Sequence, residues 1–256
     1  MSLTLYALLA AGLVAGWLAN DLRAARRKRR LRSPFPIPTV ELTEIDPVFA
    51  ENHLGPTLAT EVSFVGRGPI EVPGGTSDAE AWILAVLAKG ARRIFELGTC
   101  TGKTAYLLAR NAPADASVVT LTLAPDQRDR YTNEATDDRR SVKYALRESR
   151  FESFLYTGTS VESKITQLFG DSKEFDEKPY AGCFDLVFVD GSHAYSYVVS
   201  DSAKALAMVK PGGLVLWHDY EGPAQDGVFR AINELATRLP IVHLQGTTFA
   251  AYRANG

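Results

Sequence analysis

Residues 96–104 read ELGTCTGKT, and this stretch decides the fold because it joins a short β-rich run to a helix-like run. The run at residues 93–97 predicts a strand, and residues 103–111 predict a helix. A glycine turn at such a junction presents backbone N–H groups at the start of the helix, where a nucleotide-like ligand can bind. The stretch therefore predicts an α/β domain with a ligand at this turn.

Two common nucleotide motifs are disfavoured by the spacing of the glycines. A phosphate-binding P-loop needs four residues between its first glycine and Gly-Lys-Thr, and only three separate Gly98 from Gly102. The dinucleotide motif G-x-G-x-x-G lacks its middle glycine. The remaining pattern is an acid followed by G-x-x-x-G, and a tight turn without any ligand stays open as the alternative.

The sequence around this turn alternates between β-rich and helix-like runs, which is typical of a parallel sheet with crossover helices. Ser77 and Glu80 form a capping-box pattern, which predicts the start of a helix. Two β-rich runs that flank Gln245-Gly246 predict a final antiparallel hairpin. The expected strands are residues 93–97, 117–123, 164–169, 184–190 and 213–217, the further helices are 103–111, 194–209 and 227–239, and the hairpin joins 241–244 to 248–252.

Length and composition indicate one folded α/β domain after an N-terminal extension. The chain has 256 residues, and roughly 215 remain after the first forty or so, which suits a single domain. A net charge of −2 gives no reason to expect nucleic-acid binding. Two cysteines, Cys100 and Cys183, are too few for a disulfide framework and lack zinc-site spacing, so a reducing compartment fits best.

The N-terminus predicts a membrane anchor. Residues 2–20 carry no charge, and residues 21–32 hold seven basic residues and one acid. Because the basic cluster follows the apolar run, we expect a retained anchor with a cytoplasmic C-terminal side rather than a cleaved signal peptide. A helix that lies on the membrane, or a nucleic-acid-binding tail, is the alternative. Gly12 and Gly16 could pack two anchors together and so support a homo-oligomer.

The expected organisation has three parts. Residues 1–32 form the anchor and its basic cluster, residues 33–75 form a proline-containing linker and entrance segment, and residues 76–256 form the domain that carries the motifs. The role of residues 39–75 stays open.

Polar side chains follow the ends of several expected strands. Asp171 and Ser172 follow one strand, Asp190 and His193 the next, and His218-Asp219 come after residues 213–217. Since the carboxyl ends of parallel strands share one edge of a sheet, we expect these groups to converge near the glycine turn. Either histidine taken alone is as readily a structural residue.

These motifs together resemble a known family. The most specific are Asp-Gly-Ser-His-Ala-Tyr at residues 190–195, Lys-Pro-Gly-Gly at 210–213 and Trp-His-Asp-Tyr at 217–220. From about residue 76 to 253 the chain resembles the class I S-adenosylmethionine-dependent methyltransferases that include the macrolide-sugar O-methyltransferases and the cephalosporin hydroxylase-like proteins. The resemblance implies a Rossmann-like fold with a mostly parallel seven-stranded sheet and a C-terminal antiparallel hairpin, here preceded by the membrane helix.

The resemblance also implies roles for single residues. Asp190 would lie at the methyl-transfer centre, and His193 would be the general base. Some relatives bind Mg²⁺ through strand-end acids, which here implies Asp190 and Asp219, although the imidazole of His218 is a poor third ligand for Mg²⁺. The implied S-adenosylmethionine-binding residues are Glu96, Gly98, Thr99, Gly102, Thr122, Asp171, Ser172 and Asp190.

One position departs from the family pattern. Thr122 stands where the family more often has an aspartate that accepts both ribose hydroxyls, and a hydroxyl accepts two hydrogen bonds poorly. Asp126 in the following loop is a candidate replacement. This departure puts the affinity for the cofactor in doubt.

The expected activity is methylation of a hydroxyl on a small or lipid-linked molecule, and the anchor favours an amphiphilic acceptor. A membrane-tethered scaffold that has lost turnover is the alternative from another class, motivated by Thr122. A nicotinamide-dependent reductase or epimerase is a third interpretation, and the sequence lacks the Tyr-x-x-x-Lys pair that would support it.

Overall fold

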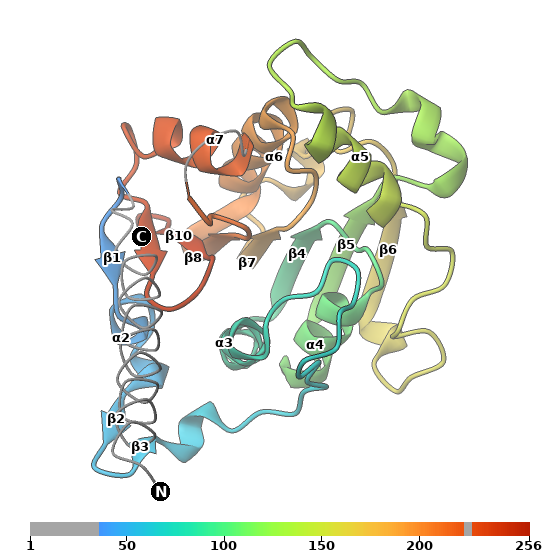
Figure 1. Cartoon of the computed structure of the whole chain (residues 1–256). Helices are drawn as coiled ribbons and strands as arrows, with labels where there is room; N and C mark the ends of the chain where they lie inside the picture. The colour runs from blue at the N-terminus through green and yellow to red at the C-terminus, as the bar shows by residue number, and fades with distance from the viewer. Residues whose placement is uncertain (1–35, 223–226) are drawn as a thin grey trace, which may run out of the picture. The chain divides into compact units, whose positions relative to one another are not determined.

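The computed structural model describes residues 36–222 and 227–256 (Figure 1). The chain divides into two compact units, Met1–Pro36 and Ile37–Gly256, of which the second holds the sheet and its helices. The expected anchor at residues 1–32 lies outside the described residues. Within the described ranges, no helix has both the length and the apolar character needed to cross a bilayer.

The larger unit is built on one sheet in the order β1-β9-β10-β8-β7-β4-β5-β6 (Figure 1). All its neighbouring strands run parallel except β10, which is antiparallel to both β8 and β9, as the predicted C-terminal hairpin requires. The strands are β1 (Thr39–Val40), β4 (Arg93–Leu97), β5 (Ser117–Thr122), β6 (Ile165–Phe169), β7 (Phe184–Val189), β8 (Val209–Trp217), β9 (Val242–Leu244) and β10 (Ala250–Arg253).

The described sheet has eight strands, so the prediction of seven is wrong by one. The additional strand is β1, in which Thr39 and Val40 pair in parallel with His243 and Leu244 of β9. A strand of two residues is too short to show the apolar–polar alternation by which strands are predicted. It forms only because β9 lies at the edge of the sheet and offers it a hydrogen-bonding partner.

The helices begin where local capping allows it. Ser77 and Glu80 form the predicted capping box, in which Ser77 Oγ accepts from the Glu80 amide and the Glu80 carboxylate accepts from the Ser77 amide. The α-helices are α2 (Leu42–Ile45), α3 (Asp78–Ala88), α4 (Lys103–Asn111), α5 (Arg139–Glu148), α6 (Tyr195–Met208) and α7 (Gly227–Leu235). The described chain also has a small hairpin, β2 (Glu51–Asn52) with β3 (Gly55–Pro56), and 3-10 helices at Pro47–Phe49, Leu58–Thr60, Pro125–Arg130, Glu162–Lys164 and Lys178–Tyr180.

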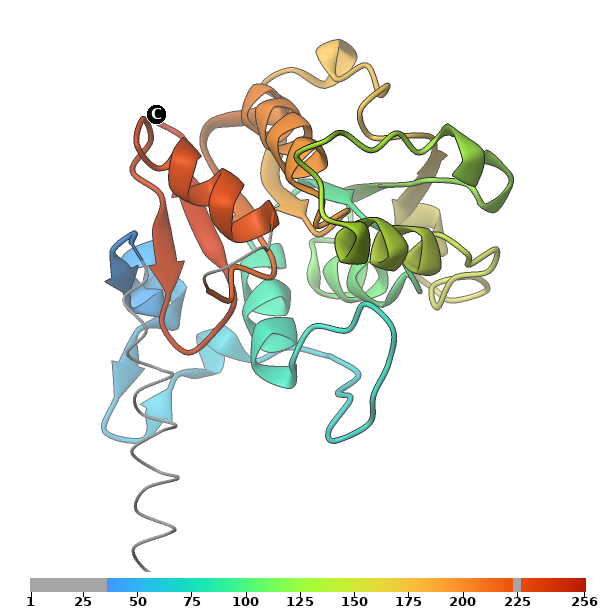
Figure 2. The same ribbon diagram turned by 45° about the horizontal axis from the view of Figure 1, so that its top comes forward.

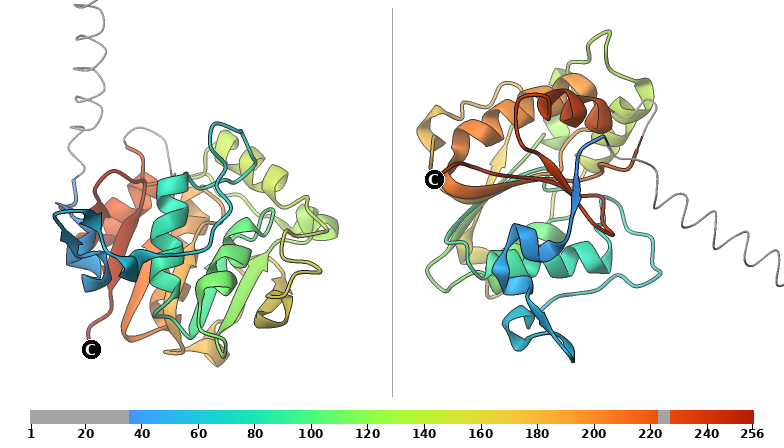
Figure 3. Two further views of the ribbon diagram at one scale, coloured as in Figure 1. Left: turned by 90° about the horizontal axis from the view of Figure 1, so that it is seen from below. Right: turned by 90° about the vertical axis from the view of Figure 1, so that its left-hand side faces the viewer.

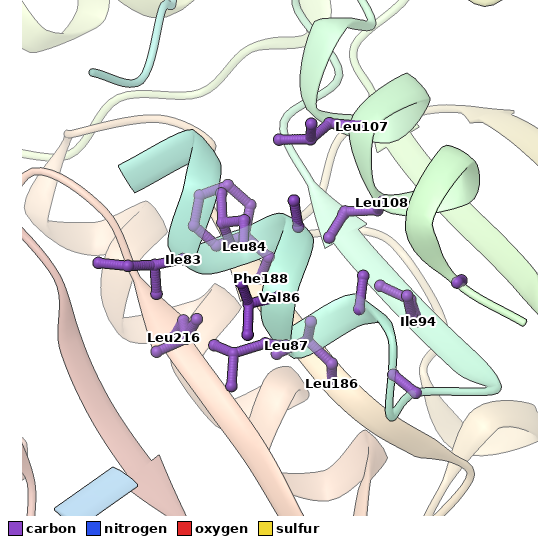
Figure 4. Packing of buried hydrophobic residues seen from close by; sticks show 14 of the residues in the cluster. Ile83, Leu84, Val86, Leu87, Ile94, Leu107, Leu108, Leu186, Phe188 and Leu216 are labelled. Atoms are coloured by element: carbon purple, nitrogen blue, oxygen red, sulfur yellow. The ribbon is translucent and has the colours of Figure 1, made fainter. Parts of the chain in front are cut away.

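Helices cover both faces of the sheet, with α3 and α4 on one face and α6 and α7 on the other (Figure 3). Ile94, Leu186 and Leu216 come from three different strands and lie under α3 (Figure 4). Because the central strands are buried on both sides, their sequences are almost continuously apolar. This core holds the strand ends at one edge, where α5 and α6 supply residues that line cavities and α3 supplies Glu80 (Figure 2).

Candidate functional site

The glycine turn between β4 and α4 is closed by contacts with protein. Gly98 has φ 104°, and a Cβ there would lie 2.0 Å from the carbonyl oxygen of Asp190. Gly102 has φ 75°, and a Cβ there would lie 2.8 Å from Phe154 and Tyr156. These positive φ values and close approaches require glycine at both positions. The turn is therefore held directly against the end of β7, where Asp190 stands.

Glu96 and Thr99 support this turn from within the core. Both are buried, and Thr120 links them, because its hydroxyl donates to Glu96 Oε2 at 2.5 Å and lies 2.7 Å from Thr99 Oγ1. Burial raises the pKa of Glu96 to about 8, against the opposing effect of the Thr120 hydrogen bond. Neither side chain lines a cavity in the described site, so their support of the turn is structural.

Two adjoining cavities open at the carboxyl edge of the sheet. The inner cavity has a volume of about 70 Å³ and is lined by Gly98, Thr122, Asp171, Ser172 and Asp190, among others. The outer cavity has a volume of about 660 Å³ and is lined by Asp190, His193, His218 and Asp219, together with residues of α5. Cys100, Glu148 and Asp190 line both, so these three residues mark the junction.

The far end of the inner cavity is formed by aromatic rings and a carboxylate. Tyr197 donates its hydroxyl to Asp171 Oδ2 at 2.7 Å, and its ring stacks on Tyr131 with centroids 4.4 Å apart. Asp171 also accepts from the backbone N–H of Lys173 at 2.9 Å. Burial raises the pKa of Tyr197, and its hydrogen bond to Asp171 adds to this effect. The neutral phenol therefore remains a donor to the carboxylate.

The end of β5 presents a hydroxyl where the family pattern has a carboxylate. Thr122 lines the inner cavity, whereas Asp126, its candidate replacement, is exposed and lines neither cavity. The expectation that Asp126 substitutes for the missing acid is therefore not supported by its position, because the residues after β5 turn away as the 3-10 helix Pro125–Arg130.

Two histidines and three carboxylates form one cluster between the outer cavity and the core. His193 Nε2 lies 2.8 Å from Asp219 Oδ2. His218 Nδ1 lies 2.8 Å from Asp190 Oδ1 and 3.3 Å from Asp219 Oδ2, and its Nε2 lies 3.6 Å from Glu80 Oε2. Asp219 has φ 59°, an uncommon conformation for a residue other than glycine, which turns its side chain back toward both imidazoles. The carboxylates of Asp190 and Asp219 thus both face Nδ1 of the His218 imidazole.

The electrostatics of this cluster favour a charged imidazole at His218. Burial works to lower the pKa of His218, but the carboxylates of Asp190 and Asp219 outweigh it and raise that pKa well above its ordinary value. Burial also works to raise the pKa of Asp219, but His218 and His193 hold it well below its usual range. At neutral pH the cluster therefore contains an imidazolium at His218 beside an ionised Asp219, whereas burial raises the pKa of Asp190.

The donors in this cluster fit Mg²⁺ poorly. Asp190, His218 and Asp219 each offer a ligand atom, all within 4.8 Å of one another. Mg²⁺ prefers six oxygen ligands, and here the third donor is a nitrogen. A proton on Nδ1 of His218 already bonds Asp190, and its charge would repel a cation. The expected pair of metal ligands, Asp190 and Asp219, is therefore engaged by histidines.

Sequence reasoning did not find two acids of the site. Glu80 was interpreted only as a capping residue, yet its Oε1 also accepts from Thr248 N at 2.7 Å and Thr248 Oγ1 at 2.8 Å, and its Oε2 faces His218. Glu148 ends α5, a helix that was not among the expected elements. The signal for Glu80 was its position in the first turn of an apolar helix, and nothing local pointed to Glu148.

Comparisons with known proteins agree with this geometry. A family model described as a methyltransferase domain matches residues 95–220. None of the curated protein sequences matches the chain. Solved structures with a similar fold include the O-methyltransferase TomG from Streptomyces achromogenes in complex with SAM. It is 23% identical to this chain, the match covers 71% of this chain and 82% of the TomG chain, and the TM-score is 0.50. The SAH-bound methyltransferase PaMTH1 from Podospora anserina is 15% identical over 72% and 81%, with a TM-score of 0.52.

Proposed function

We propose that this chain, whose residues 95–220 match a family model described as a methyltransferase domain, uses S-adenosylmethionine to methylate a hydroxyl of an acceptor bound in the outer cavity, with His193 as the general base. The observation that carries this proposal is the 2.8 Å contact between His193 Nε2 and Asp219 Oδ2, beside the Asp190 junction of the two cavities. Asp219 is then a positioning residue.

The inner cavity suits S-adenosylmethionine in its chemistry. Bound there, the cofactor supplies an electrophilic methyl group on a positively charged sulfur. Asp171, Ser172 and Thr122 offer polar groups at the nucleoside end, and Leu121 and Leu123 offer apolar surface for a base. Asp190 lies at the other end, against the glycine turn.

His193 would remove the proton of the acceptor hydroxyl. When neutral, an imidazole that donates from Nε2 to Asp219 carries its lone pair on Nδ1, and this nitrogen accepts the proton. The O–H bond would break as the acceptor oxygen uses its electron pair to take the methyl group, which the bound cofactor would supply from its sulfur. General-base assistance of this kind contributes about 10²- to 10⁴-fold. No step requires Mg²⁺.

The acceptor class follows from the outer cavity and the N-terminus. Hydroxyl, carboxylate and guanidinium groups from Ser141, Glu148 and Arg140 line the outer cavity, which suits a hydroxyl-bearing polar head. The uncharged residues 2–20 and the basic residues after them support a tether to a membrane, with the domain on its cytoplasmic side, and a lipid-linked acceptor. Gly12 and Gly16 support association of two tethers.

Calorimetry and an isotope assay test the proposal. The full-length protein in detergent should bind S-adenosylmethionine, and with the methyl-labelled cofactor it should transfer label to a hydroxyl in a membrane lipid extract or a panel of hydroxylated small molecules. Thr122 favours one competing function, a scaffold that keeps the fold and binds no cofactor. Absence of binding at millimolar cofactor would establish the scaffold and reject the methyltransferase. Fractionation of cells that express the chain with and without residues 1–32 tests the tether.

A further inference from the structure

Glu148 occupies the junction between the two cavities. It is the last residue of α5, and with Cys100 and Asp190 it lines both the inner and the outer cavity. The helix is fixed at its other end, because Asp138 accepts from the backbone N–H groups of Arg140 and Ser141 at 2.9 Å each. Glu148 therefore stands where a methyl group would pass from cofactor to acceptor.

The carboxylate of Glu148 is the least compensated of those in the inner cavity. Asp171 accepts from Tyr197 and Lys173, and Asp190 accepts from His218. Among the described residues, no hydrogen bond reaches the Glu148 carboxylate, although Arg147 Nη2 lies 3.7 Å from its Oε1 and the imidazole of His193 also acts on it electrostatically. Its side chain is 22% exposed, and it lines both cavities. Its negative charge is therefore directed toward a ligand.

The two forms of the cofactor differ in charge at this place. S-adenosylmethionine carries a positive sulfonium and a net charge of +1, whereas its demethylated product S-adenosylhomocysteine has a neutral sulfur and no net charge. In a partly buried site, an opposite charge within a few ångströms stabilises a cation much more than in water. A carboxylate at the junction would thus distinguish substrate from product.

We propose that Glu148 is a specificity-determining residue that favours S-adenosylmethionine over S-adenosylhomocysteine by placing a carboxylate that no hydrogen bond compensates beside the sulfur. This inference rests on the proposed function, since it requires the cofactor in the inner cavity. Burial raises the pKa of Glu148, so a bound cation also stabilises the ionised form of the group. The consequence for the enzyme is weaker inhibition by its own product.

The test compares three ligands by calorimetry on the full-length protein and the Glu148→Gln variant. The ligands are S-adenosylmethionine, S-adenosylhomocysteine and an analogue with a protonated amine in place of the methylsulfonium. We expect Glu148→Gln to weaken both cationic ligands about tenfold, equal to about 1.4 kcal/mol, and to leave the neutral product within about twofold. Glu152→Gln, at an exposed position that lines neither cavity, is the matched control.

Each outcome of the calorimetry either supports or overturns the inference about Glu148. An equal loss for all three ligands, no loss for any, or a change confined to the KM of the acceptor would overturn the inference. Glu148→Asp keeps the charge and should keep the preference, which separates charge from folding if Glu148→Gln is unstable. If the unmodified protein binds no S-adenosylmethionine, the proposed function fails, whereas normal binding with an unaltered preference in Glu148→Gln rejects this inference alone.

Discussion

Nδ1 of His218 lies 2.8 Å from Oδ1 of Asp190, and both side chains are almost entirely buried, with 9% and 12% exposed. The same imidazole also faces Asp219 and Glu80. A single buried cation thus compensates three carboxylates that come from α3, from the end of β7 and from the segment after β8.

Replacement of His218 by alanine should destabilise the fold strongly. The variant leaves buried carboxylates without their cation, and breaking a buried pair from one side costs about 3–5 kcal/mol. Urea unfolding of the His218→Ala protein measures this loss in the free energy of unfolding. His53→Ala, at an exposed position, should change it by less than about 0.5 kcal/mol. A loss of similar size in both variants would contradict the assigned role of His218.

The stabilisation due to His218 should depend on pH in a defined window. The folded pKa of His218 is raised above its ordinary 6.5, so its contribution is complete below that pH and disappears as pH rises through the folded value. The pKa of Asp219 is lowered from 3.8 and that of Glu80 from 4.5, so their contribution is complete above those values and disappears in acid. The difference in unfolding free energy between the unmodified protein and His218→Ala should therefore be largest between about pH 4.5 and 6.5. A difference that increases above pH 8 would refute this order of pKa values.

Glu96→Gln should stabilise the protein at neutral and alkaline pH. Glu96 has a folded pKa of about 8 against an ordinary 4.5, so the folded protein holds a proton that the unfolded chain releases. The stability of the unmodified protein therefore falls as pH rises between those values, by up to about 1.4 kcal/mol per pH unit from this group. Glutamine carries no such proton, and we expect a gain on the order of 2 kcal/mol at pH 7 in urea unfolding. Equal pH dependence in both proteins would show that Glu96 is ionised in the fold.

His193→Ala should separate binding from turnover. In the proposed mechanism the imidazole removes a proton, and it does not line the inner cavity, so the Kd for S-adenosylmethionine should stay within a few-fold while kcat falls at least about tenfold. Asp219→Asn should also lower kcat, because the amide no longer holds the imidazole in the required tautomer. Asp126→Asn, at an exposed position outside both cavities, is the control for both measurements. Unchanged turnover in His193→Ala would remove this residue from the mechanism.

Turnover should survive removal of divalent metal. The carboxylates of Asp190 and Asp219 are bonded to imidazoles, and the third donor is His218 nitrogen. We expect kcat after treatment with EDTA to stay within about twofold of the value with added Mg²⁺, and calorimetry with Mg²⁺ alone to show no binding. A tenfold loss that Mg²⁺ restores would reinstate Asp190 and Asp219 as metal ligands.

The parts of the fold that local sequence determines were predicted closely. β4 and α4 have the expected bounds, because an apolar run and a helical run meet at a glycine turn whose φ values only glycine adopts readily. β8 starts four residues before the expected 213, because residues 209–212 also belong to the strand. Such details depend on the neighbouring strand and not on local propensity.

The site also combines features that local sequence determines with features that depend on how the elements pack. The convergence of Asp190, His193 and Asp219 at one edge could be predicted, because parallel strands order their ends. The contacts of Glu80 and Glu148 could not, since they depend on where α3 and α5 lie above the sheet. The order of the pKa values likewise follows from burial, which the sequence leaves undetermined.

Strand β1 connects the start of the described domain, through backbone hydrogen bonds, to the edge of the sheet where His218 and Asp219 lie. The backbone N–H groups of His243 and Gln245 donate to the carbonyls of Pro38 and Val40 at 2.8 and 3.0 Å, β9 is bonded to β10, and β10 is bonded to β8, after which His218 and Asp219 follow. A force applied at Ile37 would therefore be transmitted across the sheet through these backbone hydrogen bonds to the strand that precedes His218 and Asp219.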